Sequence, residues 1–388
     1  MPDTKAIDKV LEEAVVSGQV PGVTAAAANA DGVIFEGAVG RRSLSGGAPM
    51  TNDTVFRIAS MTKAVTGAAA MQQVEQGRLN LDQPAGEVLP FLRNPMVLDG
   101  TDEKGEPKVR PAKGVVTLRK LLTHTAGYVY ANWNSEMAHY MAKSGHPVIQ
   151  SGKITALHAP LGFDPGERWE YGINIDLAGR MVEVASGKDL ETYFQDHIFR
   201  PLGMTDTSFI LQTKFRDRMA RVHARDETGL RPIDSVPPME NPEFYPGGGG
   251  LLSTSRDYLI FLRALMHDGE FNGARILKPE TVALMGQNHM GALNVQVMKT
   301  TNPAVSNDCE LFPGMDKKWG LSFLINTQDI PGARSAGSLA WAGINNTYYW
   351  LDPVKRIAGV LMTQILPFAD PTVLGLLDRF ERAVYATQ

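Results

Sequence analysis

A run of small and apolar residues from Val55 to Gly77 constrains the fold of this chain more than any other part of the sequence. Alanine and glycine occupy much of its centre, at positions 64 and 67–70. Side chains this small let neighbouring elements approach closely, so the run predicts a buried central helix rather than a surface helix. Gly77 marks the expected end of that helix, because glycine accepts the left-handed conformation common there.

Ser60 and Lys63 lie in the predicted first turn of this helix, and no other serine in the sequence has a lysine three positions later. Residues three apart share a helix face, so these side chains can meet. A serine becomes a good nucleophile when a base takes its proton, and a lysine whose pKa is lowered from ~10.4 by burial or a nearby cation can be that base. The helix N-terminus favours the alkoxide that forms. The alternative is a helix-capping serine followed by a solvated lysine.

Composition indicates a soluble globular protein with one elaborate domain or two. The chain has 388 residues, 43% of them hydrophobic and 21% charged, with a net charge of -4. We expect no nucleic-acid partner, because there is no basic surplus, and no membrane span, because no apolar run is long enough. No secretory signal is visible, so the expected location is the cytoplasm. Cys309 is the sole cysteine, so we expect no disulfide, and we expect no metal or cofactor.

The two ends of the chain hold the convincing strand patterns. Residues 22–29 and 33–39 flank an Asp-Gly pair, which is a strong hairpin signal. Further strands are expected near the C-terminus, at 320–326, 347–351 and 357–363, before a closing helix at 371–386. The sequence therefore predicts an α/β fold of the α+β type. Its mostly antiparallel sheet is built from both chain ends and flanked by helices.

The middle of the chain has a different character, with short helical segments between loops rich in glycine and proline. Helices are expected at 118–122, 175–185 and 190–199, and another follows the middle segment at 256–267. The charged segment Gly100–Lys113 predicts an exposed excursion. We predict a discontinuous α/β domain, residues 1–80 and 247–388, and an inserted, mainly helical domain, residues 81–246. The active site is expected in the cleft between them.

Two further segments carry groups that suit acyl chemistry. Tyr171 follows a turn and precedes a predicted helix, where it can act as general base as a phenolate or share a proton with Lys63. Gly343 lets a substrate carbonyl approach the backbone, so the Ser60 and Ile344 amides can form an oxyanion hole. The alternatives are an ordinary tyrosine at the edge of the core and a plain bend entering a strand.

Other candidates have competing structural explanations. His124 lies between two threonines but follows a helical segment, and we interpret it as a buried structural hydrogen-bonding residue. The glycines at 247–250 lack the Gly-Lys-Ser/Thr ending of a phosphate loop and predict a backbone crossing close to the core. Several aromatic residues can either narrow the cleft or pack in the core, namely Tyr128, Tyr130, Trp133, Phe244 and Tyr245.

Taken together, five segments in a fixed order resemble a known superfamily. They are Phe56–Lys63 (FRIASMTK), Leu121–Gly127 (LLTHTAG), Pro165–Tyr171 (PGERWEY), Gly247–Thr254 (GGGGLLST) and Trp341–Gly343 (WAG). The chain is similar to the serine β-lactamase-like superfamily, which includes class C β-lactamases and penicillin-binding proteins. Within it the chain resembles a family VIII carboxylesterase over residues 5–385.

The resemblance implies a β-lactamase/transpeptidase-like fold in which Ser60, Lys63 and Tyr171 meet in the cleft. Two positions depart from the lactamase pattern, because Ile173 stands where an asparagine is usual and Trp341 where a lysine is usual. Both departures match the esterase branch. Arg334, seven residues before Trp341, can partly replace the missing lysine if its loop folds over the cleft.

We therefore expect a serine hydrolase that cleaves carboxylic esters of small to medium acyl groups through a covalent acyl-enzyme. Its substrate is a small-molecule ester, bound by Trp341, Gly343 and the aromatic residues. A β-lactamase, a D-amino peptidase and an acyltransferase that passes the acyl group to an alcohol are the alternatives. A catalytically silent relative is disfavoured because the serine, lysine and tyrosine are all present. The oligomeric state is not predicted.

Overall fold

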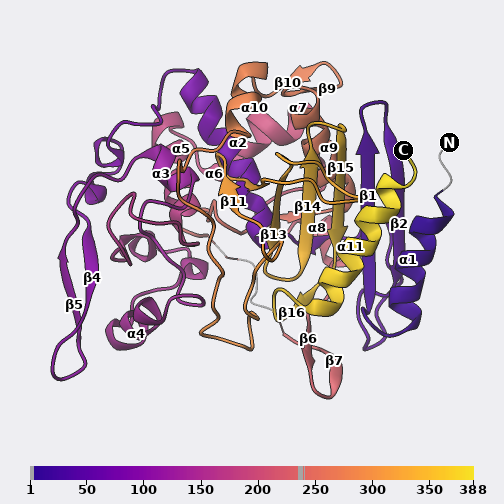
Figure 1. The fold of residues 1–388 in the computed structure, drawn as a ribbon, viewed down its shortest axis with the longest axis horizontal. Coiled ribbons are helices and arrows are strands. Elements are labelled where there is room, and N and C mark those ends of the chain that lie inside the picture. The colour runs from indigo at the N-terminus through magenta and orange to yellow at the C-terminus, as the bar shows by residue number, and fades with distance from the viewer. Residues whose placement is uncertain (1–3, 235–238, 240) are drawn as a thin grey trace.

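A seven-stranded antiparallel sheet forms the centre of the computed structural model, which describes residues 4–234, 239 and 241–388. The strand order is β11-β12-β13-β14-β15-β1-β2, so the two N-terminal strands continue the C-terminal ones (Figure 1). The bounds are β1 Gly22–Asn29, β2 Val33–Gly40, β11 Lys317–Trp319, β12 Leu324–Asn326, β13 Leu339–Gly343, β14 Thr347–Asp352 and β15 Ile357–Met362. The predicted sheet built from both chain ends is confirmed.

The C-terminal strands differ in detail from the prediction. The segment around Trp341 is a strand of its own, β13, which pairs with β14 along its whole length. β12 begins at Leu324 rather than at residue 320, and the short β11 was not predicted. Three residues, two of them lysines, give no alternating pattern that sequence analysis can detect.

Helices pack against the part of the sheet where strands from the two ends of the chain meet. α1 (Lys5–Val16) and α11 (Pro371–Tyr385) pack against each other in front of the N-terminal hairpin (Figure 1). α1 buries Ile7, Leu11 and Ala14, which the helical period places on one face. α9 (Ser255–Met266) packs on β1 and β15.

α2 (Thr62–Glu75) is the buried central helix that the sequence predicts. Its residues from Thr62 to Gln73 are all buried, and it packs mainly against α5 (Asn174–Ser186). The chain leaves the helix at Gly77, whose φ of 68° lies in the left-handed region. The small residues of α2 let α5 and the sheet approach the helix that carries Lys63.

The middle segment holds short helices and exposed hairpins. The charged excursion is the hairpin of β4 (Met96–Thr101) and β5 (Pro107–Pro111). β6 (His223–Asp226) pairs in parallel with β16 (Ile365–Leu366), so hydrogen bonds join the middle segment to the C-terminal part of the chain. The remaining helices are α3 Leu118–Leu122, α4 Ser135–Ser144, α6 Leu190–Phe194, α7 Arg200–Leu202, α8 Thr213–Arg216 and α10 Pro279–Met285. The remaining strands are β3 Phe56–Arg57, β6 His223–Asp226, β7 Gly229–Pro232, β8 Leu252–Ser253, β9 Glu270–Phe271, β10 Ala274–Arg275 and β16 Ile365–Leu366.

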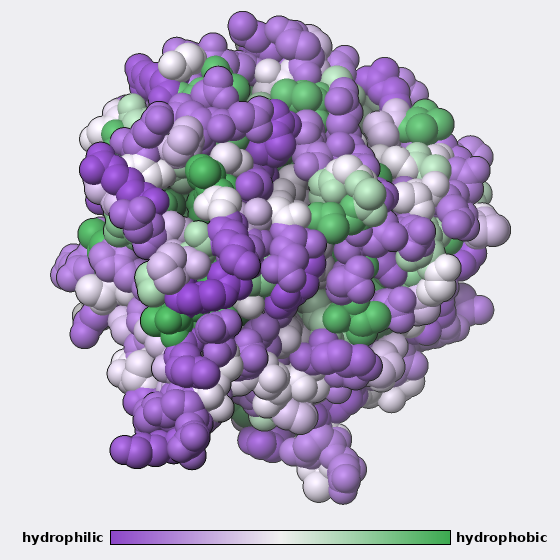
Figure 2. Space-filling model, turned by 60° about the vertical axis from the view of Figure 1, so that its left-hand side comes forward, coloured by the Kyte–Doolittle hydropathy of each residue, from purple (hydrophilic) through white to green (hydrophobic). Residues whose placement is uncertain are grey.

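The surface of the molecule carries both hydrophilic and hydrophobic residues. Figure 2 shows hydrophilic residues over most of one face, with hydrophobic residues in small separate patches. In the described part of the chain, no helix combines the length and the apolar character needed to cross a bilayer. The same residues contain no group of three or more His, Cys, Asp or Glu side chains placed to hold a metal ion. Cys309 is buried and free.

Candidate active site

Ser60 lies in a tight 3-10 turn, Ala59–Met61, just before α2. Ala59 has a φ of 44°, in the left-handed region that residues with a side chain seldom adopt. Strain of this kind persists where the surroundings hold it, and it is frequent at functional sites. Here the Tyr258 hydroxyl donates to the Met61 carbonyl over 2.8 Å and anchors the turn to α9. The Ser60 side chain is half-buried, so it stays within reach of a substrate.

Lys63 meets Ser60 as the spacing predicts. Its Nζ donates to Ser60 Oγ over 3.1 Å, to the Tyr130 hydroxyl over 3.2 Å and to the Gly248 carbonyl over 2.5 Å. Only 1% of the side chain is exposed, and this burial lowers the pKa of Lys63 to about 7, against the opposing effect of Asp176. The neutral amine keeps two donors for Tyr130 and Gly248 and turns its lone pair to the Ser60 hydroxyl. Lys63 therefore has the form and position of a base.

Tyr171 completes the predicted group. Its hydroxyl accepts a hydrogen bond from the Trp341 indole over 3.0 Å, and the Lys63 ammonium lies 4.6 Å from the centre of its ring. Burial raises the pKa of Tyr171, and hydrogen bonds with Ser60 and Trp341 only partly offset this. Burial thus favours the protonated phenol, whereas it favours the neutral amine of Lys63, and this makes Lys63 the better candidate for the base.

A buried carboxylate, Asp176, lies behind Lys63 and was not among the sequence candidates. Asp176 is in the first turn of α5 and is 0% exposed. It accepts hydrogen bonds from the Gly248 amide over 2.9 Å and from the Tyr130 hydroxyl over 3.5 Å. These donors are the residues whose oxygens bind Lys63, so one network joins the acid and the amine. A Cβ on Gly248 would come within 2.3 Å of the Asp176 carboxylate, so a side chain there would displace that carboxylate from the Gly248 amide.

The glycine-rich segment runs along α2, as predicted for a backbone crossing near the core. The Thr66 hydroxyl donates to the Gly247 carbonyl over 2.7 Å. The Thr62 hydroxyl accepts from the amides of Gly250 and Leu251 over 3.2 Å each. Two successive turns of α2 thus hold this segment in place, which fixes the Gly248 carbonyl that Lys63 binds.

Two backbone amides are free to bind an oxyanion. Neither the Ser60 nor the Ile344 amide donates a hydrogen bond within the described residues. The expected role of Gly343 needs a correction, because its open side is filled by protein. A Cβ there would lie 2.3 Å from the Ile58 carbonyl and 2.3 Å from the Thr347 hydroxyl. Gly343 therefore lets the end of β13 approach the turn that carries Ser60, and the oxyanion role of the two amides stays a prediction.

His124 has the structural place that the sequence analysis favoured. The ring is fully buried, and its Nδ1 accepts from the Gly172 amide over 3.4 Å and from the Asn174 side chain over 3.1 Å. Burial, together with the charge of Lys63, lowers the pKa of His124 well below its usual value, so the ring is neutral. His124 thereby fixes the loop that carries Tyr171.

Two of the predicted aromatic residues do surround the site. The Tyr130 and Trp133 rings lie 5.2 Å and 5.6 Å from the Tyr171 ring, measured between centres. Trp133 is held by a hydrogen bond of 3.1 Å from its indole to the Ser306 hydroxyl. Both side chains are half-buried and border the Lys63 network.

The other aromatic residues lie elsewhere. Tyr128 is 2% exposed and borders a different cavity with Phe91, so its proposed place in the substrate cleft is not supported. Tyr245 stacks on Phe209, with ring centres 5.1 Å apart, and Phe244 is buried in the core. The backbone after His124 is irregular and turns Tyr128 inward while Tyr130 faces Lys63, which sequence spacing alone did not resolve.

Arg334 cannot replace the missing lysine. Its guanidinium is 3% exposed and donates to the Glu381 carboxylate of α11 over 2.8 Å and 2.5 Å. A buried ion pair of this kind holds the arginine in the protein interior. The expectation that its loop folds over the cleft is wrong.

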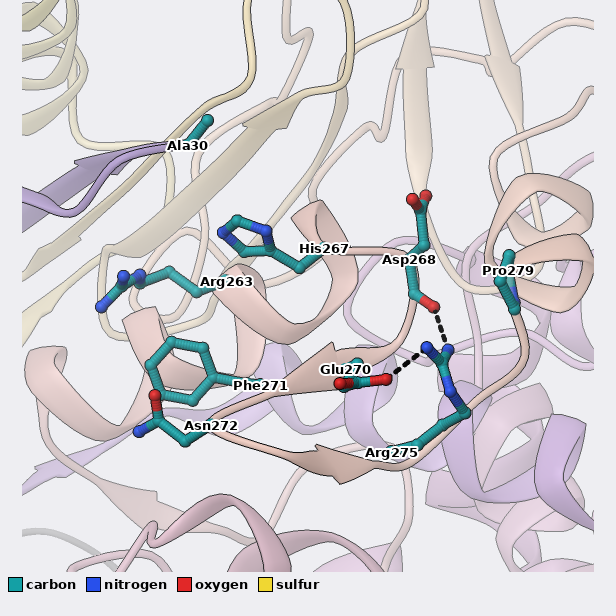
Figure 3. A pocket seen from close by; sticks show the side chains of 9 residues that line it. All are labelled: Ala30, Arg263, His267, Asp268, Glu270, Phe271, Asn272, Arg275 and Pro279. Carbon is teal, nitrogen blue, oxygen red and sulfur yellow. Dashed lines mark hydrogen bonds and ion pairs between the residues drawn. The ribbon is translucent and has the colours of Figure 1, made fainter.

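A cavity of about 530 Å³ lies elsewhere in the molecule and shares no residue with the cluster of Ser60, Lys63 and Tyr171. Figure 3 shows its wall, where Arg275 forms an ion pair with Glu270 and a hydrogen bond to the Asp268 carbonyl. Arg263 and His267 line the other side. The cavity is shallow and contains no serine, threonine or cysteine nucleophile. Chemistry therefore points to the Ser60 cluster rather than to the larger space.

One signal in the sequence did point to Asp176. It is the only charged residue between Tyr171 and Gly179, in a segment otherwise made of apolar, small and amide side chains. A lone acid in a segment expected to be buried needs partners. The partners themselves come from three distant segments, so the network as a whole was not predictable.

Known proteins and one protein-family model match this chain over nearly its whole length. The family model described as Beta-lactamase matches residues 7–380. The ML-236A carboxylate methylbutanoyltransferase of Penicillium citrinum is 34% identical, and the match covers 98% of this chain and 94% of the relative. The lovastatin esterase of Penicillium rubens is 30% identical, with 98% of each chain covered.

One solved structure is similar to this chain over its full length. The unliganded simvastatin synthase of Aspergillus terreus, as its selenomethionyl derivative, superposes with a TM-score of 0.85 at 31% identity. The match covers 100% of this chain and 99% of that one. The family model covers most of the chain and the relatives match it over nearly its full length, so the chain belongs to the beta-lactamase family.

Proposed function

We propose that this protein is a serine acyltransferase that moves a short acyl group from a small-molecule ester or thioester to an alcohol. The observation that carries the proposal is the Ser60–Lys63–Tyr171 cluster, with its buried amine, in a chain whose full-length relatives include a methylbutanoyltransferase. The sequence alone put ester hydrolysis first and transfer second. The relatives favour the reverse order.

The first half-reaction forms an acyl-enzyme. Lys63 takes the proton of Ser60 as the Ser60 oxygen attacks the acyl carbonyl. The Ser60 and Ile344 amides stabilise the negative charge on the carbonyl oxygen. The intermediate collapses, the bond to the leaving group breaks, and the proton on Lys63 passes to that leaving group, directly or through the Tyr171 hydroxyl.

The second half-reaction repeats these steps with an alcohol. The neutral Lys63 amine takes the proton of the alcohol as its oxygen attacks the acyl-enzyme. Collapse releases the new ester and returns the proton to Ser60. Water can enter in place of the alcohol, so hydrolysis is the competing outcome and the second candidate function, favoured by the likeness to lovastatin esterase.

A partition experiment separates the two functions. The purified protein is given the thioester of 2-methylbutanoate with a panel of alcohols, and the new ester and the free acid are quantified by mass spectrometry. We expect ester to exceed acid with at least one alcohol, and no turnover by Ser60→Ala. Free acid alone, at a rate that no alcohol changes, would establish an esterase. Full activity of Ser60→Ala would overturn both functions.

A further inference from the structure

A small apolar cavity adjoins the Lys63 network on the side of the middle segment. Its volume is about 110 Å³, and Tyr130 and Ile173 form part of its wall. Tyr130 accepts the hydrogen bond of Lys63, and Ile173 is two residues from Tyr171. The cavity therefore shares walls with the catalytic cluster.

The lining of the cavity suits a hydrocarbon chain. Val129, Met137, Ile149 and Ala156 are buried apolar residues on its wall, and Met141 of α4 is half-buried there. No aspartate, glutamate, lysine or arginine lines it, and its polar side chains are those of Asn132, His146 and Gln150. A binding site with mostly apolar walls and two flexible methionines selects its ligand mainly by size.

The volume limits the occupant. An engineered apolar cavity of ~150 Å³ in another protein binds benzene, a molecule of six carbons. A space of about 110 Å³ is then suited to about four carbons. That is the length of a five-carbon acyl group beyond its reacting carbonyl.

The position of the cavity separates the acyl chain from the leaving group. Tyr171 and Trp341, whose hydroxyl and indole meet over 3.0 Å beside Ser60, are not part of its wall. In the proposed reaction the leaving oxygen must reach the proton on Lys63 or Tyr171. Tyr130 and Ile173 are the residues beside the cluster that also line the cavity, so the cavity offers the acyl chain a space apart from the Tyr171 hydroxyl.

We propose that this cavity is the acyl-chain subsite and takes a linear or branched alkyl chain of about four carbons. The assignment rests on the proposed acyl-enzyme function. It makes chain length the main determinant of donor choice, because each methylene that a hydrophobic pocket gains or loses changes kcat/KM by about 10-fold or more.

Two variants with opposite effects test the subsite. Ala159→Leu adds three carbons to the wall, and Met141→Ala removes three heavy atoms from it. Donor esters from acetyl to octanoyl are compared at one fixed leaving group. In Ala159→Leu we expect the ratio of kcat/KM for pentanoyl to that for acetyl to fall at least about 10-fold. In Met141→Ala the ratio of heptanoyl to pentanoyl should rise. Met96→Ala, an exposed methionine of β4 outside the cavity, is the matched control.

The outcomes decide the proposal and keep it apart from the function on which it rests. If both variants keep the acyl profile of the parent protein, or change the choice of alcohol and not of acyl chain, the subsite assignment is overturned. If Ala159→Leu does not fold, as judged by circular dichroism, Met141→Ala decides alone. Loss of the proposed function is recognised separately, because the parent protein would then turn over no donor in a Ser60-dependent manner.

Discussion

Replacing Asp176 by asparagine should move the pH profile to lower pH. In its ionised form Asp176 favours the ammonium form of Lys63 and opposes the burial that lowers the pKa of Lys63. Burial raises the pKa of the Asp176 carboxyl itself, and the charge of Lys63 opposes that rise. The other titratable groups around Lys63 are His124, Tyr130 and Tyr171, and burial shifts the pKa of each in the direction that keeps it neutral. Without the carboxylate, the ammonium loses its charged partner and the pKa of Lys63 falls.

The size of the effect follows from the charge removed. An opposite charge at ~4–6 Å changes a pKa by about 1–3, and we take the lower figure because Asp176 reaches Lys63 through Tyr130 and Gly248. The parent value is about 7. At pH ~5.5 the neutral fraction of Lys63 would then rise from about 3% to about 24%. Activity at that pH, relative to its own plateau, should rise about eightfold.

The assay is kcat/KM for a chromogenic ester from pH 5 to 9 at constant ionic strength, because this quantity reports the pKa of the free enzyme. Asparagine keeps an oxygen for the Gly248 amide, so the backbone contact can survive. Glu183→Gln is the matched control, a buried acid of the same helix paired with Arg180, and its profile should not move. An acidic limb that stays in place or moves upward in a folded Asp176→Asn would refute the argument.

Four other outcomes test the site. Ser60→Ala should lose several orders of magnitude in kcat, with unfolding by denaturant unchanged. Lys63→Ala and Tyr171→Phe should each be severe and the double variant little worse, whereas additive losses in kcat/KM would assign them to separate steps. Trp341→Phe removes the indole donor to Tyr171 and should lower kcat about threefold to tenfold; an unchanged kcat would show that this hydrogen bond has no catalytic effect. Because Ile173 and Trp341 offer no charge or amide to a β-lactam carboxylate, ester kcat/KM should exceed that for a chromogenic cephalosporin by at least ~10²-fold, and comparable values would contradict this.

Sequence analysis predicted most of the fold because its signals are local. The Asp-Gly hairpin, the helix stop at Gly77 and the small residues of α2 each act within a few positions, and the structure has all three. Ser60 and Lys63 meet for the same reason, since they lie three positions apart in the chain. Tyr128 and Arg334 were misplaced because their surroundings depend on tertiary packing. Whether a tyrosine faces the cleft or the core is decided by residues far away in the chain.

The features that local rules do not predict are concentrated at the candidate site. A lysine and an aspartate are buried without a direct ion pair between them, and both would be costly alone. Gly248 joins the two groups, because its amide binds the acid and its carbonyl binds the amine, and a side chain at this position would displace the Asp176 carboxylate. The protein thus keeps an amine with a pKa of about 7 beside a serine, which solvent-exposed lysines cannot supply. Burial that is unfavourable for folding is here what gives Lys63 the pKa that the proposed base needs at neutral pH.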